Sequence, residues 1–241
     1  FAVFEQPDLK ASFTFTVTVP EGWTVFSNSP TPEPSPTEGG ARVFAFAPSE
    51  RMSSYITAIV AGPYVGQADE YRADDGRVVP LGVYCRASLA EHLDADELLA
   101  LTRDGLGLFE RAYGYPFPWG SYDSVLVPEY NLGAMENPGC VTFSEERYLF
   151  RGPATSAQRA SRATTILHEM SHMWFGDLVT PRWWEDTWLK ESFADHQGTW
   201  AASALGYDGA WVSFASTRKA WAYLEDQRAA TTHPIVATVD D

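Results

Sequence analysis

The sequence has little cysteine and shows no short cysteine motif. Its 241 residues contain two cysteines, Cys85 and Cys140, which are too few for the disulfide framework of a small secreted protein. Their separation also excludes a Cys-x-x-Cys zinc or redox site. We therefore expect two reduced, partly buried thiols, and the low cysteine content favours a cytoplasmic location.

Basic residues are scarce relative to acidic ones. Lys and Arg number 17 against 32 Asp and Glu, which gives a formal net charge of −15 at pH 7. Nucleic-acid phosphates and anionic membrane surfaces attract positive charge, so we expect neither nucleic acid nor membrane as a partner. The charge is compatible with a cationic substrate, such as a peptide with a free α-amino group, although an acidic surface also serves solubility alone.

Long apolar runs are missing as well. No run approaches the about 20 residues of a membrane helix, and residues 1–10 carry charges and a proline that a signal peptide lacks. The opening stretch resembles the interior of a domain. We therefore expect the native N-terminus to lie upstream of this sequence.

Strand patterns fill the first part of the chain. Alternating β-branched and aromatic residues predict strands, and the candidates are residues 13–19, 23–27, 42–47 and 55–61. Residues 29–40 contain four prolines, which predicts an exposed loop rather than a central strand. We place a domain boundary near residue 66.

Helical spacing dominates the rest of the chain. Apolar periodicity and terminal glycines predict helices at residues 94–113, 157–175, 188–205 and 209–227. Two short strand-like segments, 124–127 and 140–143, flank the sequence Gly133–Asn137. Strands followed by helices indicate an α+β fold.

The helix expected at 157–175 carries His168-Glu169-Met170-Ser171-His172. Histidines four residues apart lie on one helical face, so both imidazoles can reach the same metal ion. Glu169 is placed to act on a metal-bound water, whose pKa zinc lowers towards about 7. The pattern predicts a hydrolytic zinc site, although a helix with two unrelated histidines has the same letters.

A catalytic zinc ion usually takes three protein ligands and leaves one position open. Glu191 lies on the next expected helix, and eighteen residues separate it from His172. This interval allows one helix to end and a second to present a carboxylate to the same ion. Glu191 is therefore the predicted third ligand.

Two motifs resemble a known family. His168-Glu169-x-x-His172, followed after eighteen residues by Glu191, resembles the gluzincin metallopeptidases, and Gly133-Ala134-Met135-Glu136-Asn137 resembles the GAMEN exopeptidase motif of the aminopeptidase N family. The segment MWFGDLVTPRWWEDTWLKESFAD is similar to that family's sequence around the metal. FEQPDLKASFTFTV is similar to its N-terminal β-domain, so the resemblance covers nearly the whole chain.

The resemblance implies two domains and one zinc ion. Residues 1–66 would be the C-terminal part of an N-terminal β-sheet domain, and residues 67–241 a thermolysin-like zinc peptidase domain truncated at its C-terminal end. The implied ligands are His168, His172 and Glu191, with Glu169 as the general base. Asp195, one turn after Glu191, would orient a ligand histidine.

The resemblance also assigns a substrate site. Glu136 would bind the free α-amino group of the substrate, because a carboxylate at the end of the cleft pairs with an ammonium and leaves no room for upstream residues. Gly133 and Ala134 would offer backbone groups to the extended peptide, and Met135 and Asn137 complete the motif.

Some parts of the family pattern are missing from this sequence. A tyrosine that stabilises the oxyanion lies downstream of the segment that residues 232–235 resemble, and a second acidic contact to the α-amino group precedes the equivalent of Phe1. Because losing an oxyanion donor costs about 10²–10³ in rate, we expect a partial chain that binds zinc with weak or no turnover. Lys190 and Ser192 are local departures, where the family more often has Asn and Gly.

We therefore expect the core of a zinc-dependent aminopeptidase, which hydrolyses the N-terminal bond of peptides with a free N-terminus. An endopeptidase or a bifunctional epoxide hydrolase on the same scaffold is one alternative. A non-catalytic peptide-binding module is another, and the intact Glu169 argues against it, because a binder needs no base beside a metal.

Overall fold

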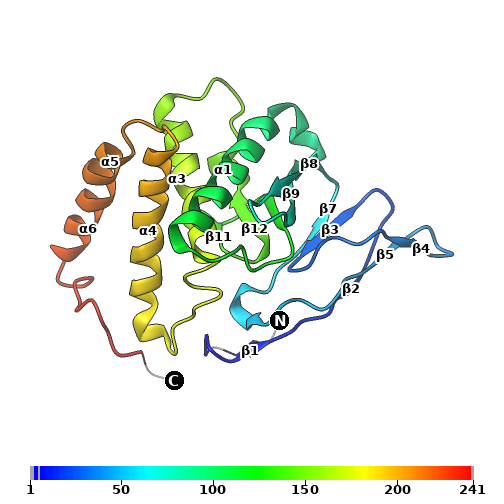
Figure 1. Cartoon of the computed structure of the whole chain (residues 1–241), viewed down its shortest axis with the longest axis horizontal. Coiled ribbons are helices and arrows are strands. Elements are labelled where there is room, and N and C mark those ends of the chain that lie inside the picture. The colour runs from blue at the N-terminus through cyan, green and yellow to red at the C-terminus, as the bar shows by residue number, and fades with distance from the viewer. Residues whose placement is uncertain (1–2, 5, 240–241) are drawn as a thin grey trace.

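Short antiparallel strand pairs build the N-terminal part of the computed structural model, which describes residues 3–4 and 6–239 (Figure 1). In this part β5 lies between β2 and β4, β3 pairs with β7, and β1 pairs with β6. The bounds are β1 Lys10–Ala11, β2 Thr16–Val19, β3 Thr24–Ser27, β4 Ser35–Pro36, β5 Arg42–Ala45, β6 Met52–Ser53 and β7 Ile59–Gly62.

Two sequence predictions in this part need correction. The proline-rich loop contains the short strand β4, which pairs with β5 at the edge of its sheet, where a proline removes no ladder hydrogen bond. The strand predicted at 55–61 begins only at Ile59, because Ser54–Ile56 form a 3₁₀-helix, η1. This turn places Tyr55 beside the centre described below.

A five-stranded mixed sheet forms the middle of the molecule, in the order β11-β12-β10-β9-β8. Its strands are β8 Tyr64–Arg72, β9 Val78–Arg86, β10 Tyr122–Val127, β11 Ala134–Met135 and β12 Gly139–Ser144. The sequence analysis missed β8 and β9; β8 is largely solvent-exposed and polar, so it lacks a strand's apolar alternation. The domain boundary predicted near residue 66 falls within β8. It stays a prediction.

Helices pack beside this sheet, and the α+β fold class is confirmed (Figure 1). Their bounds are η2 Ala87–His92, α1 Ala95–Tyr113, α2 Glu145–Tyr148, α3 Ser156–His172, η3 Trp184–Asp186, α4 Thr187–Ala204, α5 Ala210–Ser213, a π-helical turn η4 Phe214–Arg218, and α6 Lys219–Asp226. Thr155 and Gln158 form a capping box that starts α3, and the left-handed Gly114 ends α1. Three of the predicted helices correspond to α1, α3 and α4, although α3 ends three residues early, and the helix predicted at 209–227 is divided into α5, η4 and α6.

Close packing of α4 on α3 fixes the position of the predicted ligands. A Cβ at Gly198 of α4 would lie 2.7 Å from the carbonyl oxygen of Thr164 and 2.9 Å from the backbone nitrogen of His168. The missing side chain lets the two backbones approach. The apolar core beneath them joins Leu167 and Met170 of α3 to residues of α1 and the sheet.

Both cysteines are buried and unpaired, which confirms the expected thiols. Burial raises the pKa of Cys140, so the thiol form is favoured. Within residues 3–4 and 6–239, no helix combines the length and apolar character needed to cross a membrane. The cytoplasmic location stays a prediction.

Candidate metal centre

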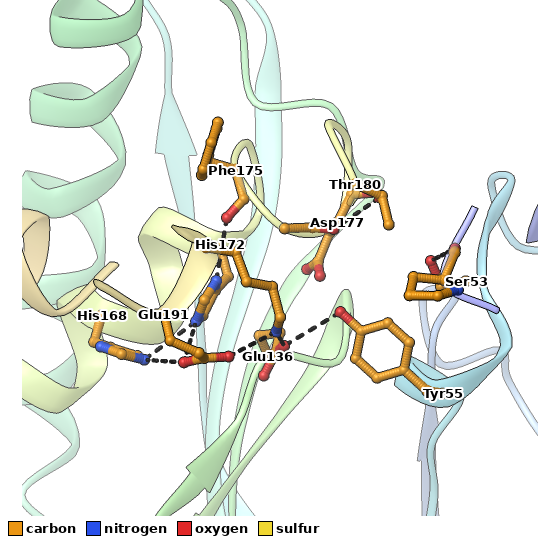
Figure 2. Close-up of polar contacts among 12 residues, drawn as sticks. Ser53, Tyr55, Glu136, His168, His172, Phe175, Asp177, Thr180 and Glu191 are labelled. Carbon is orange, nitrogen blue, oxygen red and sulfur yellow. Dashed lines mark hydrogen bonds and ion pairs between the residues drawn. The ribbon is translucent and has the colours of Figure 1, made fainter. Parts of the chain in front are cut away.

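The last two turns of α3 and the first two turns of α4 bring three predicted ligands together. The Nε2 atoms of His168 and His172 lie 3.1 Å apart, and Oε2 of Glu191 lies 3.4 Å from each. Figure 2 shows the two imidazoles and the carboxylate turned toward one another. The convergence that the sequence pattern required is therefore present.

These donor atoms fit a metal ion. Tetrahedral ligands at zinc–nitrogen distances of 2.0–2.1 Å lie about 3.4 Å apart, close to the separations observed. Nδ1 of His172 contacts the carbonyl oxygen of Phe175 at 3.2 Å. Because a carbonyl only accepts, Nδ1 donates the hydrogen and leaves the Nε2 lone pair for a cation. The ligand roles themselves stay predictions.

Glu169 is buried beside the histidines. Its carboxylate and the ring nitrogens of His168 and His172 lie within 4.8 Å of one another, and a second such set joins Glu136, His172 and Glu191. Burial raises the pKa of Glu169 well above its ordinary value, and the nearby Glu136 and Glu191 add to the effect. A raised pKa makes this carboxylate a stronger proton acceptor than an exposed glutamate.

The predicted substrate motif lies at the sheet edge. Ala134 and Met135 form β11, the outermost strand, and Met135 packs against the core. The carbonyl of Gly133 already accepts a hydrogen bond from the backbone of Ser144, at 2.9 Å, and the amide of Asn137 donates to Thr142, at 3.2 Å. These contacts hold the motif in place.

Glu136 extends from the end of β11 to the metal centre and is 5% exposed. Its Oε1 accepts a short hydrogen bond from Nζ of Lys190. The same oxygen lies 3.5 Å from the hydroxyl of Tyr55, and Figure 2 shows this tyrosine turned toward Glu136. Burial opposes ionisation of Glu136, but His172 and Lys190 outweigh burial and lower its pKa. The carboxylate is therefore held as an anion.

The sequence analysis missed the roles of Lys190 and Tyr55. Nζ of Lys190 also lies 2.8 Å from Oε1 of Glu191, so this buried lysine joins the substrate motif to the metal centre. The available signal was a lysine where the family more often has asparagine. No signal in the sequence indicated Tyr55, because this residue lies in the N-terminal part of the chain, far from the metal-binding motif.

Asp177 is a third residue that the sequence analysis did not single out. It is fully buried, and neither carboxylate oxygen has a hydrogen-bond partner among the residues that the structure describes. Burial raises its pKa, Glu136 adds to this, and Lys190 acts in the opposite direction. Figure 2 places Asp177 between His172 and Tyr55.

Asp195 does not make the predicted contact. Its carboxylate lies 3.4 Å from Nε of Arg218, in the π-helical turn η4, and Nδ1 of His168 has no hydrogen-bond partner in the described part of the chain. Although Asp195 is one turn from Glu191, it faces the C-terminal helices. The orienting contact to a ligand histidine is instead made by the carbonyl of Phe175, to His172.

A cleft of about 460 Å³ opens beside the centre, between α4 and the C-terminal helices. Its lining includes His168, Glu191 and Asp195 together with Phe214 and Trp221. A larger cavity, of about 630 Å³, lies between α3 and the same helices and contains none of the predicted ligands. The smaller cleft gives the metal centre access to solvent.

Comparisons with known proteins find two matching domains. The peptidase M1 N-terminal domain matches residues 1–56, and the peptidase family M1 domain matches residues 98–241. Aminopeptidase N of Streptomyces lividans is 52% identical over 244 residues, covering 100% of this chain and 28% of the relative. Leucyl aminopeptidase of Saccharolobus solfataricus is 31% identical, with 99% and 29% covered.

Human aminopeptidase N is 34% identical over 200 residues, which cover 81% of this chain and 20% of the relative. The chain thus spans less than a third of the length of these relatives. The M1 domain match covers more than half of this chain and confirms the resemblance found in the sequence. The chain belongs to peptidase family M1, the metallopeptidase family of aminopeptidase N.

Proposed function

We propose that the protein carrying this sequence is an aminopeptidase that uses one zinc ion to release N-terminal residues from peptides. One observation carries the proposal: the buried carboxylate of Glu136 lies within 4.8 Å of donor atoms of His172 and Glu191. A peptide whose α-ammonium binds Glu136 would place its first peptide bond at the metal centre, where it would be hydrolysed. The names of the relatives support the same activity.

His168, His172 and Glu191 would hold the zinc ion through two imidazoles and a carboxylate, a donor set typical of catalytic zinc. Bound zinc supplies Lewis-acid polarisation and lowers the pKa of a water to about 7. Glu169 accepts the proton of the attacking water and passes it to the leaving amine. Its burial excludes competing solvent from this transfer.

Glu136 gives the reaction its exopeptidase character. Its carboxylate pairs with the α-ammonium of the substrate through charge-assisted hydrogen bonds. The edge strand β11 can add the extended peptide as a further strand. Burial of Glu136 beside Tyr55 closes the end of the site, which leaves no path for residues upstream of the first.

The test compares leucine p-nitroanilide with its N-acetylated form, in the whole protein and in Glu136→Gln. We expect the acetylated substrate to resist cleavage, and Glu136→Gln to lower kcat/KM for the free substrate about 10²-fold, through loss of a charged hydrogen bond in a buried site. Glu38→Gln, on the exposed surface, is the matched control. Equal cleavage of both substrates would indicate an endopeptidase.

Metal content provides the second arm of the test. Glu191→Ala should reduce bound zinc, measured by atomic emission after dialysis, because two ligands hold the ion more weakly than three. Glu136→Gln should retain it. Full zinc retention in Glu191→Ala would contradict the assigned ligand set.

A further inference from the structure

Lys190 occupies the position on Glu136 that the proposed function gives to the substrate. Its Nζ donates to Oε1 of Glu136, lies 2.8 Å from Glu191 and 5.3 Å from the ring centre of Tyr55. Lys190 is 4% exposed. An ammonium belonging to the protein thus already neutralises the carboxylate that would bind the ammonium of a peptide.

A peptide N-terminus must therefore share Glu136 with Lys190 or displace it. Two ammonium groups on one buried carboxylate repel each other, because the interior screens charge weakly. Glu191 keeps only Oε1 for Lys190, because its Oε2 faces the two histidines and would bind the metal. A lysine that gives up Glu136 to the substrate therefore keeps one shared carboxylate, and a second buried acceptor would replace the lost one.

Asp177 has the properties of such an acceptor. It is fully buried, and both of its carboxylate oxygens lack a hydrogen-bond partner in the described chain. Burial raises its pKa, and the nearby cations Lys190 and Lys10 act in the opposite direction. A buried carboxylate without a partner is costly, and a cation beside it recovers part of that cost. Figure 2 draws Asp177 and Glu136 on the same side of the metal centre, near Tyr55.

We propose that Lys190 pairs with Glu136 in the free protein and transfers to Asp177 when a peptide N-terminus binds. Lys190 then competes with the substrate's ammonium for Glu136, and Asp177 is the receiver, the carboxylate that accepts Lys190 when the ammonium binds. Together they set the affinity for the substrate's ammonium. The proposal rests on the proposed role of Glu136, and it makes Lys190 and Asp177 positioning residues.

The test is a calorimetric titration of leucinamide into the zinc-loaded whole protein, in a Glu169→Gln background that prevents turnover. Lys190→Gln should tighten binding about 10-fold, because Glu136 is freed for the ligand. Asp177→Asn should weaken binding about 10-fold, because the displaced lysine loses its receiver. The double variant should bind like Lys190→Gln alone, since Asp177 acts only through the lysine.

Three controls separate this proposal from its alternatives. Lys190→Arg keeps the cation and should bind leucinamide like the parent. Arg228→Gln, in an exposed ion pair, should change nothing. Glu136→Gln should abolish binding; if it does not, the proposed function itself fails, whereas loss in Glu136→Gln with no gain in Lys190→Gln overturns only the present proposal.

Two further outcomes would overturn it. Equal weakening by Asp177→Asn with and without Lys190 would mean that Asp177 contacts the ligand directly. Unchanged binding in Asp177→Asn would show that Asp177 does not accept the displaced lysine. Where Lys190→Gln fails to fold, as judged by circular dichroism, the Asp177→Asn titration decides, since that change keeps the shape of the side chain and removes only its ability to ionise.

Discussion

Helix α3 carries a cluster of charged side chains toward each end, and the two clusters differ in how they are paired. At its N-terminal half, an arginine cluster joins Arg159 and Arg162 to Asp94 and Glu97 at the start of α1. At its C-terminal end, an acidic cluster gathers around the metal centre, and its members are Glu136, Glu169, Asp177, Lys190 and Glu191.

The arginine cluster is balanced. Arg162, 2% exposed, lies 3.0 Å from Asp94 and 3.2 Å from Glu97, and its guanidinium donates to the carbonyl oxygen of Tyr148 and stacks over Phe150. The acidic cluster has four carboxylates and one lysine. Balanced charge fixes the packing of α3 on α1. In the acidic cluster, burial instead raises the pKa of Glu169 and Asp177, so these two carboxyl groups are held in their neutral form more readily.

The largest effect should come from Glu169→Gln in the acidic cluster. Hydrolysis of leucine p-nitroanilide should fall about 10²–10⁴-fold, the usual contribution of a positioned base. The melting temperature should not fall, because the substitution removes a carboxyl group whose pKa is raised by burial and whose ionisation in the folded state is therefore costly. Loss of activity that is explained by unfolding of the variant would contradict this prediction, because it would give Glu169 the structural role that we assign to the arginine cluster.

The next effect should come from Arg162→Met in the arginine cluster. We expect a loss of about 3 kcal/mol in the free energy of unfolding, at the low end for breaking a buried pair, because Asp94 and Glu97 keep some solvent. Urea unfolding of the metal-free protein measures it. Arg228→Gln, in an exposed pair, is the control and should cost less than about 0.5 kcal/mol.

The smallest effect should come from Asp177→Asn, and it depends on pH. Burial raises the pKa of Asp177 in the folded state, so the native protein binds more protons than the unfolded one and loses stability as pH rises above about 4. Asp177→Asn should therefore stabilise the metal-free protein by about 1 kcal/mol at pH 8, and the gain should vanish near pH 4. A pH-independent gain would contradict this origin.

The acidic cluster also shows which contacts can be predicted from the sequence. Both histidines and Glu169 lie within five residues of one helix, so helical periodicity predicts their proximity. Glu191 needed the further assumption that the next helix returns to the same point. The same reasoning failed for Asp195, because one helical turn does not determine which neighbour a side chain faces.

The remaining contacts depend on tertiary structure. Tyr55, Glu136, Asp177 and Lys190 come from four separate segments, and their meeting depends on the sheet order and on the close approach at Gly198. The long amphipathic helices were predictable, whereas the polar, exposed β8 was not, because its pairing with β9 replaces the missing apolar pattern.

The reach of Tyr55 into the centre has a consequence for protein engineering. Its hydroxyl lies 3.5 Å from Glu136, and its ring packs edge-on against Trp184 at 5.1 Å. Tyr55 belongs to the region that the M1 N-terminal domain matches, residues 1–56. Chimeras that exchange that region between relatives would therefore inherit their substrate preference partly from the donor.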